Sequence, residues 1–135
     1  MGIIISFFLL TFGGFLTPAW AIDFNAIMMD EADQPILDCP NDAQGCVPGT
    51  EAWAKARKVT LGMIVSKALF ASYPDEQQLP ADEKWNRAAL AMRVRDGKDV
   101  KLTVEEIALI KKLVGKAYSP LLVYRAFTLL DPGQK

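Results

Sequence analysis

The sequence predicts a small, mainly α-helical domain, a bundle of about four helices that ends in a helical hairpin. Three observations predict this class. Apolar residues recur at helical spacing over residues 61–72, 81–95 and 102–130. These segments begin near residues that cap helices and end near proline or glycine. The chain has 135 residues, a usual size for one domain.

Residues 1–21 are predicted to be a secretory signal peptide. The segment has no charged side chain and holds an apolar run from Ile3 to Leu16. Pro18 and an A-x-A sequence at 19–21 form a typical cleavage site, so the mature chain is expected to begin at Ile22. Two alternatives stay open. One is an uncleaved membrane anchor, because a span needs about 20 apolar residues. The other is a misassigned start codon, which would leave a cytoplasmic protein.

Residues 22–50 are expected to form a β-hairpin and a cysteine-containing loop. An apolar run that includes Phe24 and Met29 precedes an acidic turn, and Pro35-Ile36-Leu37 follows the turn. Two short extended runs around a polar turn are typical of a hairpin.

The two cysteines, Cys39 and Cys46, flank a segment of turn residues. In an oxidising compartment they are candidates for a disulfide around a small loop. In a reducing cytosol we expect free thiols.

Residues 51–135 are expected to form the helical domain. Residues 51–58 are expected to form one or two helical turns with Trp53 on the buried side. Thr60 is expected to cap a helix over 61–72. The inward residues of that helix are predicted to be Leu61, Ile64 or Val65, Ala68 and Leu69.

The next helix is predicted over residues 81–95. Acidic residues in its first turn and arginines toward its end complement the helix dipole. One side carries Trp85, Ala88, Ala89 and Met92, which we expect to face the core. Trp85 is also a candidate anchor for a partner, although a large aromatic at helical spacing more often belongs to the core.

The C-terminal hairpin is expected to be the core that the other elements pack against. Thr103 and Glu106 have the spacing of a capping box. Ser119 and Pro120 begin the second helix of the hairpin, which is apolar except for two residues up to Leu130. The surplus of apolar positions there also predicts a face for a protein partner, made of Leu121, Tyr124, Arg125 and Phe127 together with Trp85.

The sequence predicts no catalytic, cofactor-binding or metal-binding residue. Histidine is absent, and with it the commonest general base and metal ligand. Two cysteines alone are too few for a structural zinc site. A carboxylate-based hydrolase would have to use Asp82, Glu83, Glu105 and Glu106, yet all four lie in first turns, where the helix dipole already favours them. The net charge of −1 gives no basic excess for nucleic acid.

Residues 61–62 and 105–121 resemble a group of small phage and prophage proteins. Asp23-Phe24, the acidic turn and Pro35-Ile36 resemble the opening of those proteins as well. The resemblance implies a phage accessory role in the cytosol and carries no catalytic residues. The apolar leader departs from that group and favours a role in the cell envelope.

Together these observations predict a non-enzymatic protein that acts by protein–protein interaction, such as a phage or prophage accessory or assembly factor. The alternatives are a membrane-tethered or periplasmic structural component and, third, a small carboxylate-based hydrolase. The partner is expected to be another protein or a second copy of the chain. A membrane would be a partner only if Met1–Ala21 is retained.

Overall fold

The structure is a computed structural model that describes residues 21–39 and 46–131. Its helices are α1 (Glu51–Lys55), α2 (Leu61–Phe70), α3 (Ala81–Val94), α4 (Val104–Ala117) and α5 (Pro120–Leu130), with a 3-10 turn η1 (Pro74–Glu76). The strands β1 (Ala21–Ile22), β2 (Leu37–Asp38), β3 (Arg57–Lys58) and β4 (Val100–Lys101) pair antiparallel, β1 with β4 and β2 with β3. The predicted mainly α fold is confirmed.

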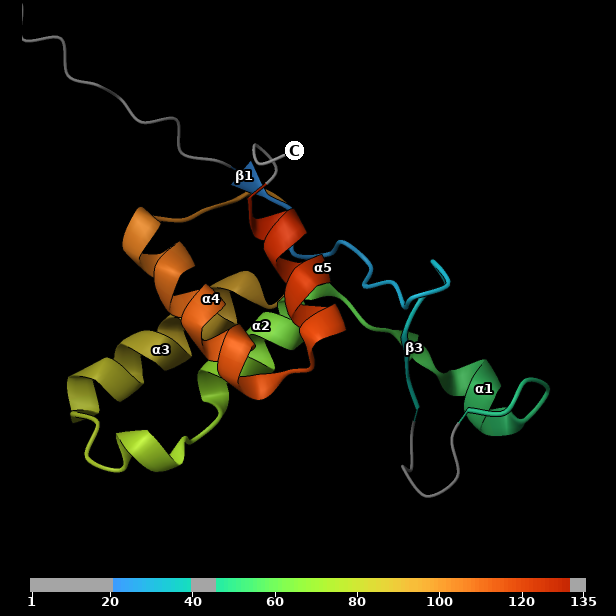
Figure 1. The fold of residues 1–135 in the computed structure, drawn as a ribbon, viewed down its shortest axis with the longest axis horizontal. Coiled ribbons are helices and arrows are strands. Elements are labelled where there is room, and N and C mark those ends of the chain that lie inside the picture. The colour runs from blue at the N-terminus through green and yellow to red at the C-terminus, as the bar shows by residue number, and fades with distance from the viewer. Residues whose placement is uncertain (1–20, 40–45, 132–135) are drawn as a thin grey trace, which may run out of the picture.

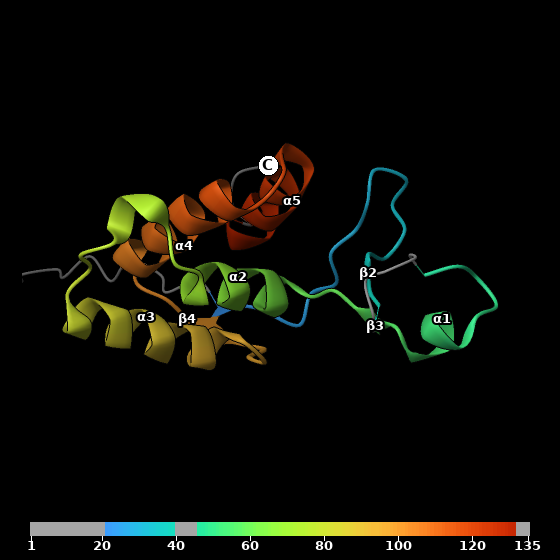
Figure 2. The ribbon, with the colours of Figure 1, turned by 90° about the horizontal axis from the view of Figure 1, so that it is seen from below.

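Helix α2 lies at the centre of the molecule. It contacts α3, α4 and α5, and Figure 2 shows α3 on one side of it and the α4–α5 hairpin on the other. Its predicted inward residues are buried, both Ile64 and Val65 included. The expectation that the C-terminal hairpin forms the core is therefore wrong in part, since α5 buries only Ala126 and Leu130.

A glycine permits the close approach of α2 to the end of α3. A Cβ added at Gly62 would overlap the carbonyl oxygen of Arg95 and would lie 2.9 Å from that of Val94. The Gly62 N–H donates a 2.7 Å hydrogen bond to the carbonyl oxygen of Phe24. Gly62 therefore brings together α2, the end of α3 and the N-terminal segment around Phe24.

The N-terminal segment packs into this core. Ile22, Phe24 and Met28 are all buried. The predicted hairpin forms in a short version, with an antiparallel bridge between Met29 and Pro35 around the acidic turn. The named strands, in contrast, pair with distant segments.

The helix starts follow the sequence closely. Thr60 accepts a hydrogen bond from the Met63 N–H. Thr103 and Glu106 form the expected capping box. Ser119 occupies the cap position of α5, but its side chain makes no capping hydrogen bond.

The predicted inward face of α3 is wrong. The buried residues of this helix are Arg87, Leu90, Ala91 and Val94. Trp85 and Met92, expected inside, are 71% and 62% exposed. The two sets share the same helical spacing and differ by a rotation of the helix, and the buried set includes an arginine whose partner is on another segment.

Candidate functional site

An arm projects from the helical body. We define the arm as the described residues between 37 and 58, namely β2, Cys39, residues 46–50, α1 and β3. Figures 1 and 2 show β2, β3 and α1 standing away from α2 to α5. None of the described residues of the arm is buried. The prediction that Trp53 faces a core is therefore wrong, because α1 does not pack on the body.

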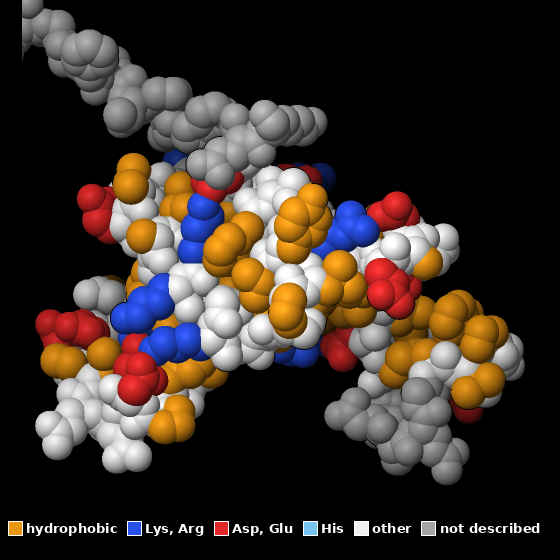
Figure 3. All heavy atoms as spheres, viewed as in Figure 1, with side chains coloured by type: hydrophobic (Ala, Val, Ile, Leu, Met, Phe, Trp, Pro, Cys, Tyr) orange, Lys and Arg blue, Asp and Glu red, His pale blue; other side chains and the backbone are white. Residues whose placement is uncertain are grey.

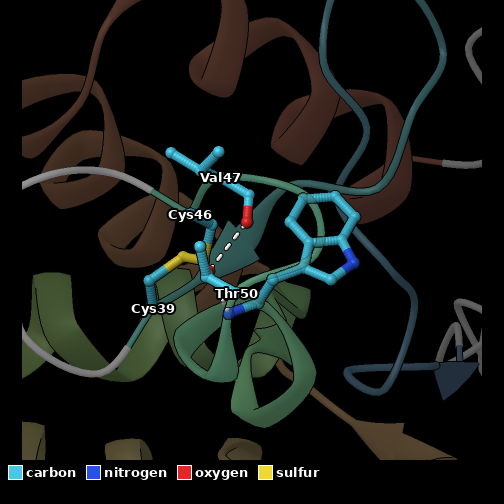
Figure 4. The surroundings of a disulfide bond; sticks show 5 residues. Cys39, Cys46, Val47 and Thr50 are labelled. Atoms are coloured by element: carbon cyan, nitrogen blue, oxygen red, sulfur yellow. Dashed lines mark hydrogen bonds between the residues drawn. A yellow bond between two sulfur atoms is a disulfide. The ribbon is translucent and has the colours of Figure 1, made fainter.

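Covalent and polar contacts hold the arm together in place of a core. The Cys39–Cys46 disulfide forms, with its Cα atoms 5.9 Å apart. The Thr50 hydroxyl donates a 2.7 Å hydrogen bond to the Val47 carbonyl and accepts one from the Trp53 N–H at 3.3 Å. Figure 4 shows Val47 and Thr50 beside the disulfide. The turn before α1 is thereby fixed to the cross-linked loop.

The arm exposes large apolar side chains. Val47 is 54% exposed and Trp53 is 41% exposed. Figure 3 shows hydrophobic side chains gathered on this projecting part of the molecule. A partner surface that covered them would gain apolar burial, and tryptophan is the residue type that contributes most at such contacts.

The charges of the arm are mostly paired within it. Lys55 and Glu51 lie 2.5 Å apart, and Arg57 and Asp38 lie 3.3 Å apart. Within the described residues, Lys58 forms no ion pair and its residue is exposed. Among its described residues, the arm thus offers exposed apolar side chains and one ammonium group that forms no ion pair.

The predicted partner face on α5 is only partly available. Tyr124 is 67% exposed, while Leu121 and Phe127 are half-buried. The Lys111 ammonium lies 5.4 Å from the centre of the Phe127 ring. Arg125 donates hydrogen bonds to the Asp30 carbonyl oxygen at 2.9 Å and to an Asp33 carboxylate oxygen at 2.7 Å. Arg125 therefore fastens the acidic turn to α5.

Trp85 does not join that face. It lies on α3, and Figures 1 and 2 place α3 and α5 on different sides of α2. The structure therefore brings Leu121, Tyr124, Arg125 and Phe127 together on one helix and leaves Trp85 apart from them.

The four carboxylates considered for hydrolysis do not gather at one place. Arg93, near the end of α3, lies 2.5 Å from Glu106 at the start of α4. Asp82 and Glu83 lie about 15 Å from Arg93, at the start of α3, given a rise of about 1.5 Å per residue. Glu106 is also engaged in the capping box. The first turn of α3 therefore lies far from the first turn of α4, which carries Glu105 and Glu106 and meets the other end of α3.

A cavity lies between the end of α2, η1 and the first half of α3. It has a volume of about 420 Å³. Its apolar walls include Leu69, Phe70, Leu79 and Ala88, and its charged lining residues are Glu76, Lys84 and Arg87. Sequence reasoning missed this cavity, because its polar groups come from segments that show no shared motif.

An ion pair lies in the wall of this cavity. Arg87 Nη1 lies 2.7 Å from Glu76 Oε2, and the two side chains are only 10% and 12% exposed. The hydrogen bond from Arg87 lowers the pKa of Glu76 below its usual 4.5, and that same bond raises the pKa of the Arg87 guanidinium. Both groups are therefore charged at neutral pH.

A second layer of contacts positions Glu76. The Lys116 ammonium lies 3.8 Å from Glu76 Oε1 and 2.5 Å from Asp75 Oδ2. It also lies 5.4 Å from the centre of the Tyr73 ring. The Tyr73 hydroxyl donates to the Ala68 carbonyl at 2.8 Å, and burial raises the pKa of this tyrosine. The turn that carries Glu76 is thereby tied to α2 and α4.

Residues 21–39 and 46–131 show neither a metal-binding cluster nor a membrane-spanning helix. These residues contain no group of three or more cysteine, aspartate and glutamate side chains placed to hold a metal ion. None of their helices is both long enough and apolar enough to span a bilayer. The disulfide is compatible with an exported protein.

The arm and the cavity are thus the two features that the helical packing does not account for.

A scan against protein-family models, a search of curated proteins and a search of solved structures each find no match to this chain.

Proposed function

We propose that this protein is a non-enzymatic interaction protein whose arm contacts a protein partner. The observation that carries the proposal is the arm itself, a disulfide-linked projection in which none of the described residues is buried and Val47 and Trp53 are exposed. Keeping apolar side chains in water costs about 25 cal/mol for each Å². A partner that covers them recovers that free energy.

The chemistry of the arm also describes the partner. The exposed Trp53 and Val47 fit an apolar depression, and the ammonium of Lys58, which pairs with no described carboxylate, fits an acidic group on the partner. Because the ion pairs within the arm already compensate Lys55 and Arg57, a strongly acidic partner surface is not required.

The setting that we propose is an exported one, in which the disulfide stays oxidised. A phage or prophage accessory or assembly factor and an envelope component are both proposals for the role there. Mass spectrometry of the protein purified from its own cell tests the setting. A chain that begins at Ile22 supports export. A reduced cysteine pair in a chain that keeps its leader contradicts it.

Affinity capture with matched variants tests the arm. The wild type, Val47→Ser/Trp53→Ser, Trp85→Ser and Tyr124→Ser are used as baits in extract of the producing cell. We expect a protein that the first, third and fourth baits capture and the arm variant loses, and that binds the purified wild type directly. Loss with Tyr124→Ser or Trp85→Ser alone would move the interface to α5 or α3 and contradict the arm.

A further inference from the structure

The cavity between α2, η1 and α3 presents free hydrogen-bond donors at its wall. Only Nη1 of Arg87 bonds to Glu76, and no hydrogen bond joins Nε or Nη2 to a described residue. Within the described part of the chain, Arg125 Nε is the only buried side-chain nitrogen or oxygen that lacks a partner. The Nε and Nη2 atoms of Arg87 therefore keep some solvent-accessible surface although the side chain is only 10% exposed, and Arg87 is one of the residues that line the cavity.

The charges that line the cavity favour an anion. Lys84 and Arg87 are cations and Glu76 is an anion, so the lining carries one net positive charge. Glu76 already has Arg87 at 2.7 Å and Lys116 at 3.8 Å. Glu83 is close enough to Arg87 to influence it, but it lies outside the lining and is exposed to water, which screens its charge. A monoanion would complete the balance.

The walls and the volume define the rest of the ligand. Leu69, Phe70, Leu79 and Ala88 give the cavity apolar sides. Its volume of about 420 Å³ falls in the range of small-molecule sites. A planar guanidinium with two free N–H directions matches the two oxygens of a carboxylate.

We propose that this cavity binds a small monocarboxylate with an apolar body, held by Arg87 and Lys84. The carboxylate accepts hydrogen bonds from Arg87 Nε and Nη2, and the apolar body lies against Leu69, Phe70 and Leu79. Two sources supply this chemistry, a free carboxylic acid and the C-terminus of a peptide that ends in an apolar residue. The site does not include the arm, so this proposal and the proposed function stand or fall separately.

Chemical-shift titration of the purified protein, uniformly labelled with ¹⁵N, tests the proposal. The probes are 4-phenylbutyrate for the free acid and N-acetyl-phenylalanine for a peptide C-terminus. Their neutral counterparts are 4-phenylbutanol and N-acetyl-phenylalaninamide. We expect at least one carboxylate to give saturable shifts at residues that line the cavity, and its neutral counterpart to bind at least about tenfold more weakly. The carboxylate that binds more tightly identifies the source.

Variants separate the guanidinium fork from general charge. Arg87→Lys keeps the charge and should weaken binding about tenfold or more. Lys84→Gln should weaken it about threefold, whereas Lys67→Gln, an exposed lysine on α2 outside the lining, should not change it. If Arg87→Lys fails to fold, the Lys84 and Lys67 pair still decides the matter. Equal affinity of both lysine variants, equal binding of the neutral probes, shifts elsewhere, or no saturation by about 10 mM would each overturn the proposal.

Discussion

The contact between α2 and α3 makes a sharp prediction for one substitution, Gly62→Ala. At this position the added methyl group would overlap the Arg95 carbonyl oxygen, which belongs to the backbone and has little freedom to move. Gly115 offers the matched control. It lies in α4 at an exposed position, and a Cβ there would meet no atom within 4 Å.

The two substitutions should change the free energy of unfolding in opposite directions. Alanine is favoured over glycine in a helix by up to about 1 kcal/mol, so Gly115→Ala should stabilise the protein by about 0.5–1 kcal/mol. At Gly62 the same gain is opposed by overpacking, which costs about 1–3 kcal/mol and sometimes more when the backbone must shift. We therefore expect Gly62→Ala to destabilise the protein by about 1–2 kcal/mol.

Urea denaturation followed by far-ultraviolet circular dichroism, with the disulfide kept oxidised, measures both effects. With a slope of about 1–3 kcal/mol per molar urea, the two variants should differ in midpoint by roughly 1 M. Gly62→Ala with a midpoint equal to or above that of Gly115→Ala would refute the close approach of α2 and α3.

Three further predictions concern a cap, the disulfide and an ion pair. Thr103→Ala should cost about 1 kcal/mol of stability in urea denaturation, while Ser119→Ala, whose hydroxyl makes no capping bond, should stay within about 0.5 kcal/mol. Reducing Cys39–Cys46, seven residues apart, should cost at most about 2.5 kcal/mol and should speed amide exchange in the arm while α2 stays protected. Because its hydrogen bond to Arg87 lowers the pKa of Glu76 in the folded state, the stability that it gives is full above the usual pKa of 4.5 and is lost as pH falls through the folded value. Urea midpoints between pH 7 and 3 should therefore fall less steeply for Glu76→Gln than for the wild type.

The helices that begin at a local signal could be predicted from the sequence. Thr60, Thr103 and Pro120 each fix a helix start through the chain's own backbone within one turn, so no distant contact is needed to interpret them. The sequence also predicts the inward residues of α2 but leaves Ile64 and Val65 as alternatives, and the structure buries both because α3 and the α4–α5 hairpin cover this helix from two sides.

The inward face of α3 could not be predicted by the same reasoning. Alanine and leucine occur on more than one side of this helix, so the choice of face depended on Trp85. The structure buries Arg87 instead, and the reason is Glu76, which reaches it from the η1 turn eleven residues earlier. Since a charged side chain enters a core only beside its partner, sequence spacing alone could not place it. The cavity was missed for the same reason.

The arm departs furthest from what periodicity can predict. Residues 51–58 are expected to form a short helix with Trp53 on its buried side, and the structure exposes this side chain. The structure replaces that missing burial with the Cys39–Cys46 cross-link, the Thr50 hydrogen bonds and two ion pairs, none of which requires a core. A hydrophobic pattern cannot indicate a segment that folds by these means.

The disulfide and the Thr50 hydrogen bonds explain how so small an arm could bind the proposed partner with useful affinity. An isolated five-residue helix is not stable in water, so a free peptide with the α1 sequence would have to be ordered at the moment of binding. Ordering costs about 0.5–1.5 kcal/mol for each flexible side chain that becomes fixed. The cross-link and the Thr50 turn order Val47 and Trp53 beforehand, so less of the burial energy is lost. Because reduction of the disulfide would return that cost, the oxidised form of the arm should be the form that binds.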